Sequence, residues 1–220
     1  MPKLNGLFDS FDNLDQITSA DIARWLKSAP PATYLEKYLA NKILYPQAMP
    51  ISDQDMKIDL AILRQALRFN GPRLTKNNAL LGDNPFLNIT LRKIFIPEKF
   101  LQFAPDLLSL AWAFIDALLL DRRKEDWFQD LWTVVLTDEV DEIVGSVLLP
   151  QFKSDGGTIA LTIQGKTYKI SSGSLMTIPC IESHCQLEFK FNQGKILGKK
   201  EGVVEVYGGR LGLLIDGRIN

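Results

Sequence analysis

Apolar and polar positions follow two different periods along this chain, and the change occurs near Pro150. Before it, apolar residues recur every three to four positions, the spacing of amphipathic helices. After it, short runs of alternating apolar and polar residues are separated by glycine turns, as in antiparallel strands. The sequence therefore predicts an α+β fold: an N-terminal multi-helical body over residues 1–153, followed by a small antiparallel β barrel or sandwich over residues 154–220.

Helix signals are clearest in the first 72 residues. Ser19 is the expected N-cap of a helix over 20–28, and a second helix is expected over 32–44. In that second helix Leu35, Tyr38 and Leu39 are expected to be buried, with Ile43 a further candidate, whereas Glu36, Lys37 and Lys42 are expected to face water.

A third helix is expected from Ser52, which forms a variant capping box with Asp55. Its apolar stripe consists of Met56, Leu60, Leu63 and Leu67. The carboxylates Asp53, Asp55 and Asp59 fit the acidic first turns of a helix, where the helix dipole favours negative charge. Asn70, Gly71 and Pro72 are expected to end it.

The segment 73–95 is rich in turn residues and is expected to be a long loop with one short helix or strand. Pro97 and Pro105 suit the first turns of helices that start at Glu98 and at Asp106, the second of them reaching residue 121. A last helix is expected from residue 126 to about 137. The residues 140–147 either continue it or form a separate short helix.

The β module is expected to follow the turn cluster at residues 153–157. Its expected strands cover residues 158–163, 167–170, 174–178, 185–191, 195–197, 203–207 and 211–215. About 65 residues are near the lower limit for a stable independent core, so we expect this module to dock on the helical body.

Composition excludes several classes of protein. The chain is 46% hydrophobic and 23% charged with a net charge of −1, which argues against general binding to nucleic acid or anionic membranes. The most apolar stretch, residues 107–120, is shorter than the ~20 residues that span a bilayer and contains Asp116. With two cysteines the sequence does not resemble a disulfide-stapled secreted domain, so a cytoplasmic location is expected.

Cys180, His184 and Cys185 are the candidate residues for chemistry, because two thiols and an imidazole can bind zinc together. A structural zinc site needs a fourth ligand, and adjacent His184 and Cys185 project oppositely in an extended chain. Thiol catalysis needs a base within hydrogen-bond reach, which sequence neighbours rarely provide. The favoured interpretation is a turn that enters the strand 185–191, with metal binding, catalysis and a redox role as alternatives.

Three other groups have a functional and a plainer interpretation. The acidic run 138–142 could bind a hard cation, but a solvated face is favoured. The basic run 122–124 could contact phosphate, but such cations also suit a helix C-terminus. The aromatic side chains Trp112, Trp127 and Trp132 could line a pocket, although rings at helical spacing more often build a core.

No catalytic, cofactor-binding or metal residue is assigned, and no cofactor is expected. We therefore interpret the chain as a non-enzymatic interaction, assembly or regulatory module with a protein partner, no nucleic acid and no membrane span. The alternative is an enzyme or small-ligand sensor with its site at the interface of the helical and β parts. The sequence leaves the oligomeric state open.

Overall fold

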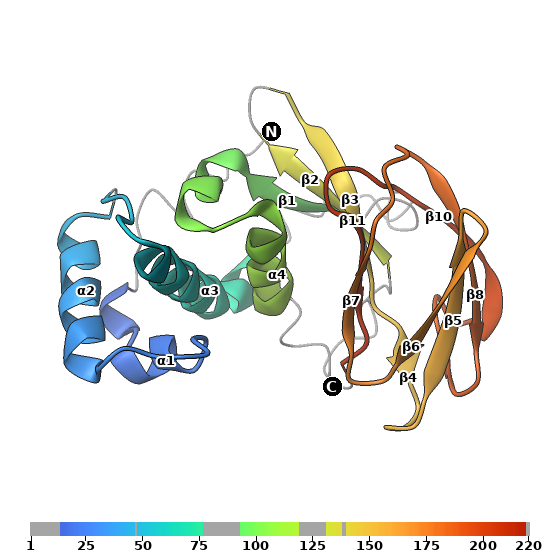
Figure 1. The fold of residues 1–220 in the computed structure, drawn as a ribbon, viewed down its shortest axis with the longest axis horizontal. Coiled ribbons are helices and arrows are strands. Elements are labelled where there is room, and N and C mark those ends of the chain that lie inside the picture. The colour runs from blue at the N-terminus through green and yellow to red at the C-terminus, as the bar shows by residue number, and fades with distance from the viewer. Residues whose placement is uncertain (1–13, 47, 77–92, 119–130, 138–139, 219–220) are drawn as a thin grey trace. The chain divides into compact units, whose positions relative to one another are not determined.

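The computed structural model describes residues 14–46, 48–76, 93–118, 131–137 and 140–218 (Figure 1). The chain divides into two compact units, each described here by itself. The helix-rich unit comprises residues 1–85 and 99–121, and the strand-rich unit comprises residues 86–98 and 122–220. The presence of helices and several sheets confirms the predicted α+β class.

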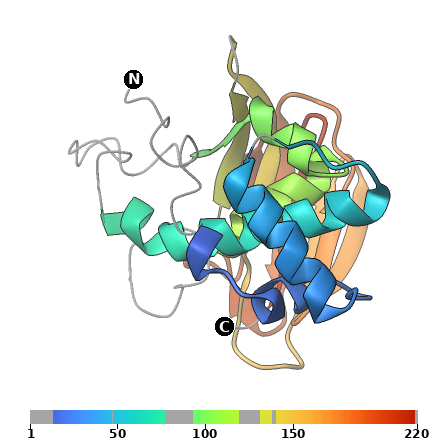
Figure 2. The same ribbon diagram turned by 90° about the vertical axis from the view of Figure 1, so that its left-hand side faces the viewer.

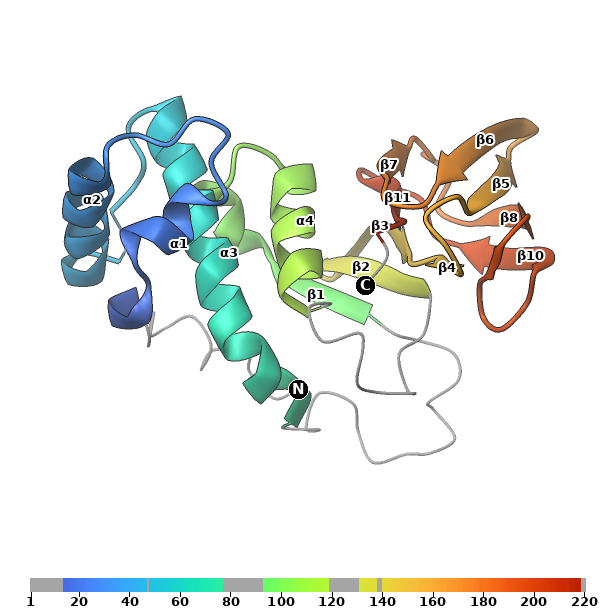
Figure 3. The ribbon, with the colours of Figure 1, turned by 90° about the horizontal axis from the view of Figure 1, so that it is seen from below.

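In the helix-rich unit, α3 is the central helix. It contacts both α1 and α4, and α1 also contacts α2 (Figures 2 and 3). The elements are η2 (Leu14–Gln16), α1 (Ser19–Ala23), α2 (Ala32–Leu44), α3 (Asp53–Lys76), η4 (Glu98–Phe103, whose first residue belongs to the strand-rich unit) and α4 (Leu107–Leu118).

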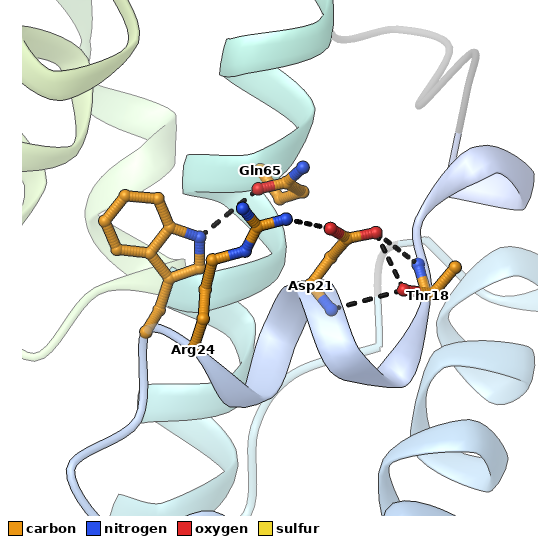
Figure 4. Close-up of polar contacts among 5 residues, drawn as sticks. Thr18, Asp21, Arg24 and Gln65 are labelled. Carbon is orange, nitrogen blue, oxygen red and sulfur yellow. Dashed lines mark hydrogen bonds and ion pairs between the residues drawn. The ribbon is translucent and has the colours of Figure 1, made fainter.

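The first helix is shorter than predicted and has a different cap. Thr18, not Ser19, is the N-cap, and it forms a reciprocal capping box with Asp21 (Figure 4). Partial burial alone would raise the pKa of Asp21, but hydrogen bonds from Thr18 and Arg24 lower it overall. Beyond the helix, the Trp25 indole Nε1 donates to Gln65 Oε1 of α3 at 3.3 Å. This bond ties α1 to the central helix.

The bounds of α2 and the start of α3 were predicted correctly. The Ser52 hydroxyl accepts from the backbone N–H of Asp55, and the Asp55 carboxylate accepts from the backbone N–H of Ser52, as the capping box requires. The predicted end of α3 is wrong, because the backbone stays helical to Lys76. A proline removes one helical hydrogen bond and bends a helix, but it does not have to end it.

Burial along α3 explains why its stripe was predicted only in part. Leu63 and Leu67 are buried as expected, whereas Leu60 is half-buried. Ile58 and Ile62 are also buried, in a core cluster with residues of α1 and α2. The helix therefore buries more than one face, and a single stripe does not describe it.

Two segments of the strand-rich unit that were predicted to be helical are strands. The predicted helix over 126–137 is wrong in its described part, because Leu131–Thr137 is strand β2. The segment 140–147 contains strand β3 (Glu142–Leu148), not a helix. Both runs are short and apolar, and a fully buried strand is not distinguishable from a helix by periodicity alone.

A five-stranded sheet results, with the order β1-β2-β3-β11-β7. Its remaining strands are β1 (Lys93–Pro97), β7 (Leu175–Ile178) and β11 (Gly212–Asp216). The sheet is mixed, since β1 pairs with β2, and β3 with β11, in parallel. The predicted helical body over 1–153 thus contributes three strands to a sheet that the sequence did not predict.

The second sheet has the order β10-β8-β5-β6 and is antiparallel throughout, as predicted. It consists of β5 (Thr158–Ile163), β6 (Lys166–Ser171), β8 (Cys185–Phe191) and β10 (Glu201–Val206), and β4 (Gln151–Phe152) pairs separately with β9 (Gly194–Lys195). Gln164 and Gly165, both at positive φ, form the two-residue turn between β5 and β6.

One core cluster contains residues of both large sheets, among them Leu213 and Ile215 of β11 and Leu161 and Leu187 of the antiparallel sheet. The strand pairings among the described residues do not close a barrel. Within the same described residues, no helix is long and apolar enough to cross a bilayer.

The sheet topology predicts that residues 154–220 fold poorly by themselves. That fragment keeps β11, which is buried along its whole length, but lacks β3, its parallel partner. The fragment still contains β7, which pairs with one edge of β11, but the other edge is left open, and an open edge on an apolar strand favours aggregation. We expect a poorly dispersed amide spectrum, and a better one for residues 122–220, which restore β2 and β3. A sharp, monomeric spectrum from residues 154–220 would contradict this topology.

Candidate functional site

The three residues that the sequence singled out lie around the start of β8. Cys180 and Cys185 are both buried and free, and their Sγ atoms are 2.6 Å apart. His184 does not join them: its Nε2 lies 3.4 Å from Glu205 Oε2, and its ring contacts that of Tyr207. In the part of the chain that the structure describes, no three His, Cys, Asp or Glu side chains gather in a metal-binding arrangement.

The remaining sequence candidates give no second cluster. Trp112 and Trp132 are half-buried, and Glu142 of the acidic run pairs with Arg210 at 3.3 Å. Trp127, the basic run 122–124 and residues 138–139 lie outside the described residues.

A buried ion pair in the helix-rich unit escaped the sequence analysis. Lys42 of α2 and Asp59 of α3 are only 3% and 2% exposed, and Lys42 Nζ lies 2.7 Å from Asp59 Oδ2. The ammonium group also lies over the Phe103 ring, 4.8 Å from its centroid. The predicted exposure of Lys42 is therefore wrong.

Tyrosine hydroxyl groups extend this pair into a network. Tyr38 Oη donates to Asp59 Oδ1 at 3.0 Å, and Tyr34 Oη donates to Asp55 Oδ1 at 3.0 Å. Because Asp55 also caps α3 through Ser52, the network connects the exposed side of α2 to the start of α3. Five polar side chains from two helices thus hold the α2–α3 corner together.

Burial of both charges carries a desolvation cost that limits how much the pair adds to stability. Burial raises the pKa of Asp59, and the hydrogen bond and charge of Lys42, together with Tyr38, offset this only in part. Burial, followed by the charge of Asp59, also raises the pKa of Tyr38. The desolvation cost of a buried ion pair commonly equals or exceeds its attraction, so such a pair is weak evidence for added stability.

What the pair does is fix the connection between the two helices. Lys42 Nζ donates a second hydrogen bond, of 2.5 Å, to the carbonyl oxygen of Ala48. The backbone N–H of Ala48 donates to the Tyr45 carbonyl oxygen at 2.9 Å, which closes a turn. A charged hydrogen bond from a buried, immobile side chain therefore sets the path of the chain after α2.

Large apolar side chains project from this fixed connection into solvent. Leu44 is 72% exposed and Ile51 is 96% exposed. We define the apolar segment as residues 43–51, in which residue 47 is not described; its exposed apolar side chains are Ile43, Leu44, Tyr45, Met49 and Ile51. Exposed apolar residues are ordinary when scattered singly, but five within nine positions form a candidate contact surface.

Helical spacing gave a hint that Lys42 is buried, but residue type favoured its exposure. Lys42 lies seven positions after Leu35 and three after Leu39, so helical spacing places it near their buried face, as it also does Ile43, four positions after Leu39. Residue type alone favoured burial of Ile43 and exposure of Lys42, and the structure has the reverse. Asp59 was explained by the acidic start of α3, although it lies too far from that end to stabilise the dipole.

Searches with protein-family models, against curated proteins and against solved structures found no match to this chain. The candidate function therefore rests on the geometry of the chain itself.

Proposed function

We propose that this protein is a non-enzymatic interaction module that binds a protein partner through the apolar segment. The observation that carries the proposal is the combination of five exposed apolar side chains with a buried ion pair whose lysine hydrogen-bonds to the backbone of the same segment at Ala48. An apolar surface that is already ordered loses little conformational entropy on binding, so preorganisation increases affinity.

The expected partner presents an apolar face rather than a charged one. The charges near the segment in sequence are balanced: over residues 36–57, Lys37, Lys42 and Lys57 are opposed by Glu36, Asp53 and Asp55. Such a surface gives no strong electrostatic steering, and its binding energy would come from apolar burial. The aromatic ring of Tyr45 is a good anchor for a pocket on the partner, because tyrosine is enriched among residues that dominate binding energy.

Two finer points belong to the same proposal. The two large sheets of the strand-rich unit would form a β sandwich, which the core cluster common to both sheets supports. A cytoplasmic location is supported by the small number of cysteines.

Photo-crosslinking tests the contact surface. A photoreactive phenylalanine analogue at position 44 is expected to give one discrete protein adduct in the cells that produce the chain. The matched control carries the analogue at position 175 in β7, where Leu175 is 48% exposed, and is expected to give none.

The substitution Ile51→Asp, made in the position-44 variant, should abolish the adduct by placing a charge in the contact. The absence of an adduct at position 44, or the same adducts at both positions, would contradict the proposed function. An adduct with a second copy of this chain would identify self-association as the interaction, and mass spectrometry distinguishes the two cases.

A further inference from the structure

Cys180 and Cys185 form a second feature, independent of the apolar segment. Their Sγ atoms, 2.6 Å apart, are about half an ångström farther from each other than bonded disulfide sulfurs. Both side chains are buried, at 2% and 5% exposure. The four residues between them, 181–184, are all exposed.

The backbone holds the two thiols in this position. The N–H of Gly208 donates to the Glu182 carbonyl oxygen at 3.1 Å, and the N–H of Gly209 donates to the Cys180 carbonyl oxygen at 2.8 Å. A Cβ at position 208 would lie 2.3 Å from both of these carbonyl oxygens and 2.8 Å from Cys180 Sγ. Glycine is therefore required where the chain passes the thiol pair.

The surroundings of Cys185 disfavour its thiolate, the form that binds a metal or attacks a disulfide at neutral pH. The polar groups near the sulfur atoms are mainly acceptors, the Glu182 carbonyl oxygen and a Glu182 carboxylate oxygen, with one donor, Gln164 Nε2, 3.9 Å from Cys185 Sγ. Burial, then the neighbouring Cys180 thiol and Glu182, raise the pKa of Cys185 to about 12. At neutral pH Cys185 is thus held as a thiol, so zinc binding is disfavoured and any thiol–disulfide exchange through Cys185 is slow.

We propose that Cys180 and Cys185 are a redox-sensitive pair that forms an intramolecular disulfide by exchange with a low-molecular-weight disulfide. One cysteine thiolate attacks a sulfur of the small disulfide, and a small thiolate leaves. The other cysteine thiolate then attacks the protein sulfur of this mixed disulfide, and the second small thiolate leaves. Two electrons pass to the small disulfide, and the two cysteine protons end on the two small thiols.

A disulfide between Cys180 and Cys185 would change the exposed loop 181–184 more than the core. Closing the ring fixes both ends of residues 181–184, including Ile181, which is 89% exposed. Because β8 begins at Cys185, the bond also anchors the first residue of that strand. The oxidised protein thus presents a rigid loop, and the reduced protein presents one that opens more readily.

The pH dependence of the oxidation rate should reflect the raised pKa of Cys185. Since the reacting form is the thiolate, the rate rises about tenfold for each pH unit while the pH stays below the thiol pKa. For Cys185 in the folded, reduced protein, the pH range over which the rate keeps rising extends to about pH 12. We expect slow oxidation at pH 7 and a continuing increase through pH 9.

The test uses the full chain with oxidised and reduced glutathione at a series of ratios. After acid quenching, free thiols are alkylated with N-ethylmaleimide in denaturant and the intact mass is measured. The oxidised wild type is expected to lose two hydrogen atoms, to take up no maleimide and to retain no glutathione. A reducing thiol should restore two alkylation sites.

The variants Cys180→Ser and Cys185→Ser are matched controls, since each retains one thiol of similar size and position. Each is expected to end with either one maleimide or one glutathione. Two maleimide groups on the wild type at every ratio, a stable glutathione adduct on it, or a disulfide between two chains would each overturn the proposal.

Discussion

Replacing Asp59 with alanine is expected to lower the free energy of unfolding by about 3–5 kcal/mol. The reason is that Lys42 stays buried against the Phe103 ring but loses its counter-charge, which lies 2.7 Å away in the wild type. Tyr38 loses its hydrogen-bond acceptor on Asp59 in the same variant. Urea unfolding followed by circular dichroism measures the effect.

The double variant Lys42→Met/Asp59→Leu is the matched control. Replacing both partners of a buried ion pair by apolar residues of similar volume is often neutral or stabilising. We therefore expect the double variant to recover most of the loss, although the Ala48 carbonyl oxygen loses its donor and Tyr38 loses its acceptor on Asp59. A double variant that is less stable than Asp59→Ala would show that the pair itself stabilises the fold, contrary to our account.

Leu63→Ala is expected to cost about 2–5 kcal/mol, because removal of a buried leucine side chain leaves a cavity that the surroundings fill only partly. Leu63 lies in the central helix of its unit and is only 1% exposed, so its side chain is enclosed by other protein atoms. The same unfolding experiment measures this loss.

Leu175→Ala removes the same atoms from a side chain that is 48% exposed and is expected to change stability by only about 0.5 kcal/mol. Equal losses in Leu63→Ala and Leu175→Ala would contradict the placement of α3 in the core.

The elements that were predicted correctly are those determined by nearby residues, such as prolines, capping residues and apolar spacing. The α2 bounds follow from the flanking prolines and the apolar spacing, and the start of α3 follows from the Ser52–Asp55 capping box. Strands β5 and β8 were predicted with their observed bounds, because each alternates buried and less buried residues between clear turns.

The elements that were predicted wrongly depend on distant residues. The run Leu131–Thr137 becomes a strand by pairing with β1 and β3, and no feature within the run distinguishes a buried strand from a buried helix. Parallel pairing of β3 with β11 joins segments more than 60 positions apart, which periodicity does not reveal.

The candidate site was missed for a similar reason. Predicting an ion pair between α2 and α3 requires knowing how the two helices pack against each other. Taken alone, Lys42 and Asp59 are each typical of a solvent-exposed helix face. In contrast, Cys180 and Cys185 were noticed from sequence because they are five positions apart, but their close approach depends on Gly208 of a later segment.

We propose that the buried Lys42–Asp59 pair holds the apolar segment in an arrangement that a protein partner can bind. Crosslinking from position 44 in the Lys42→Met/Asp59→Leu background tests it most directly, with the unfolding transition measured on the same sample. We predict a folded protein with a cooperative transition and a clearly lower yield of the position-44 adduct. An unchanged yield would contradict the claim, because the segment would then bind its partner without the ion pair that fixes it.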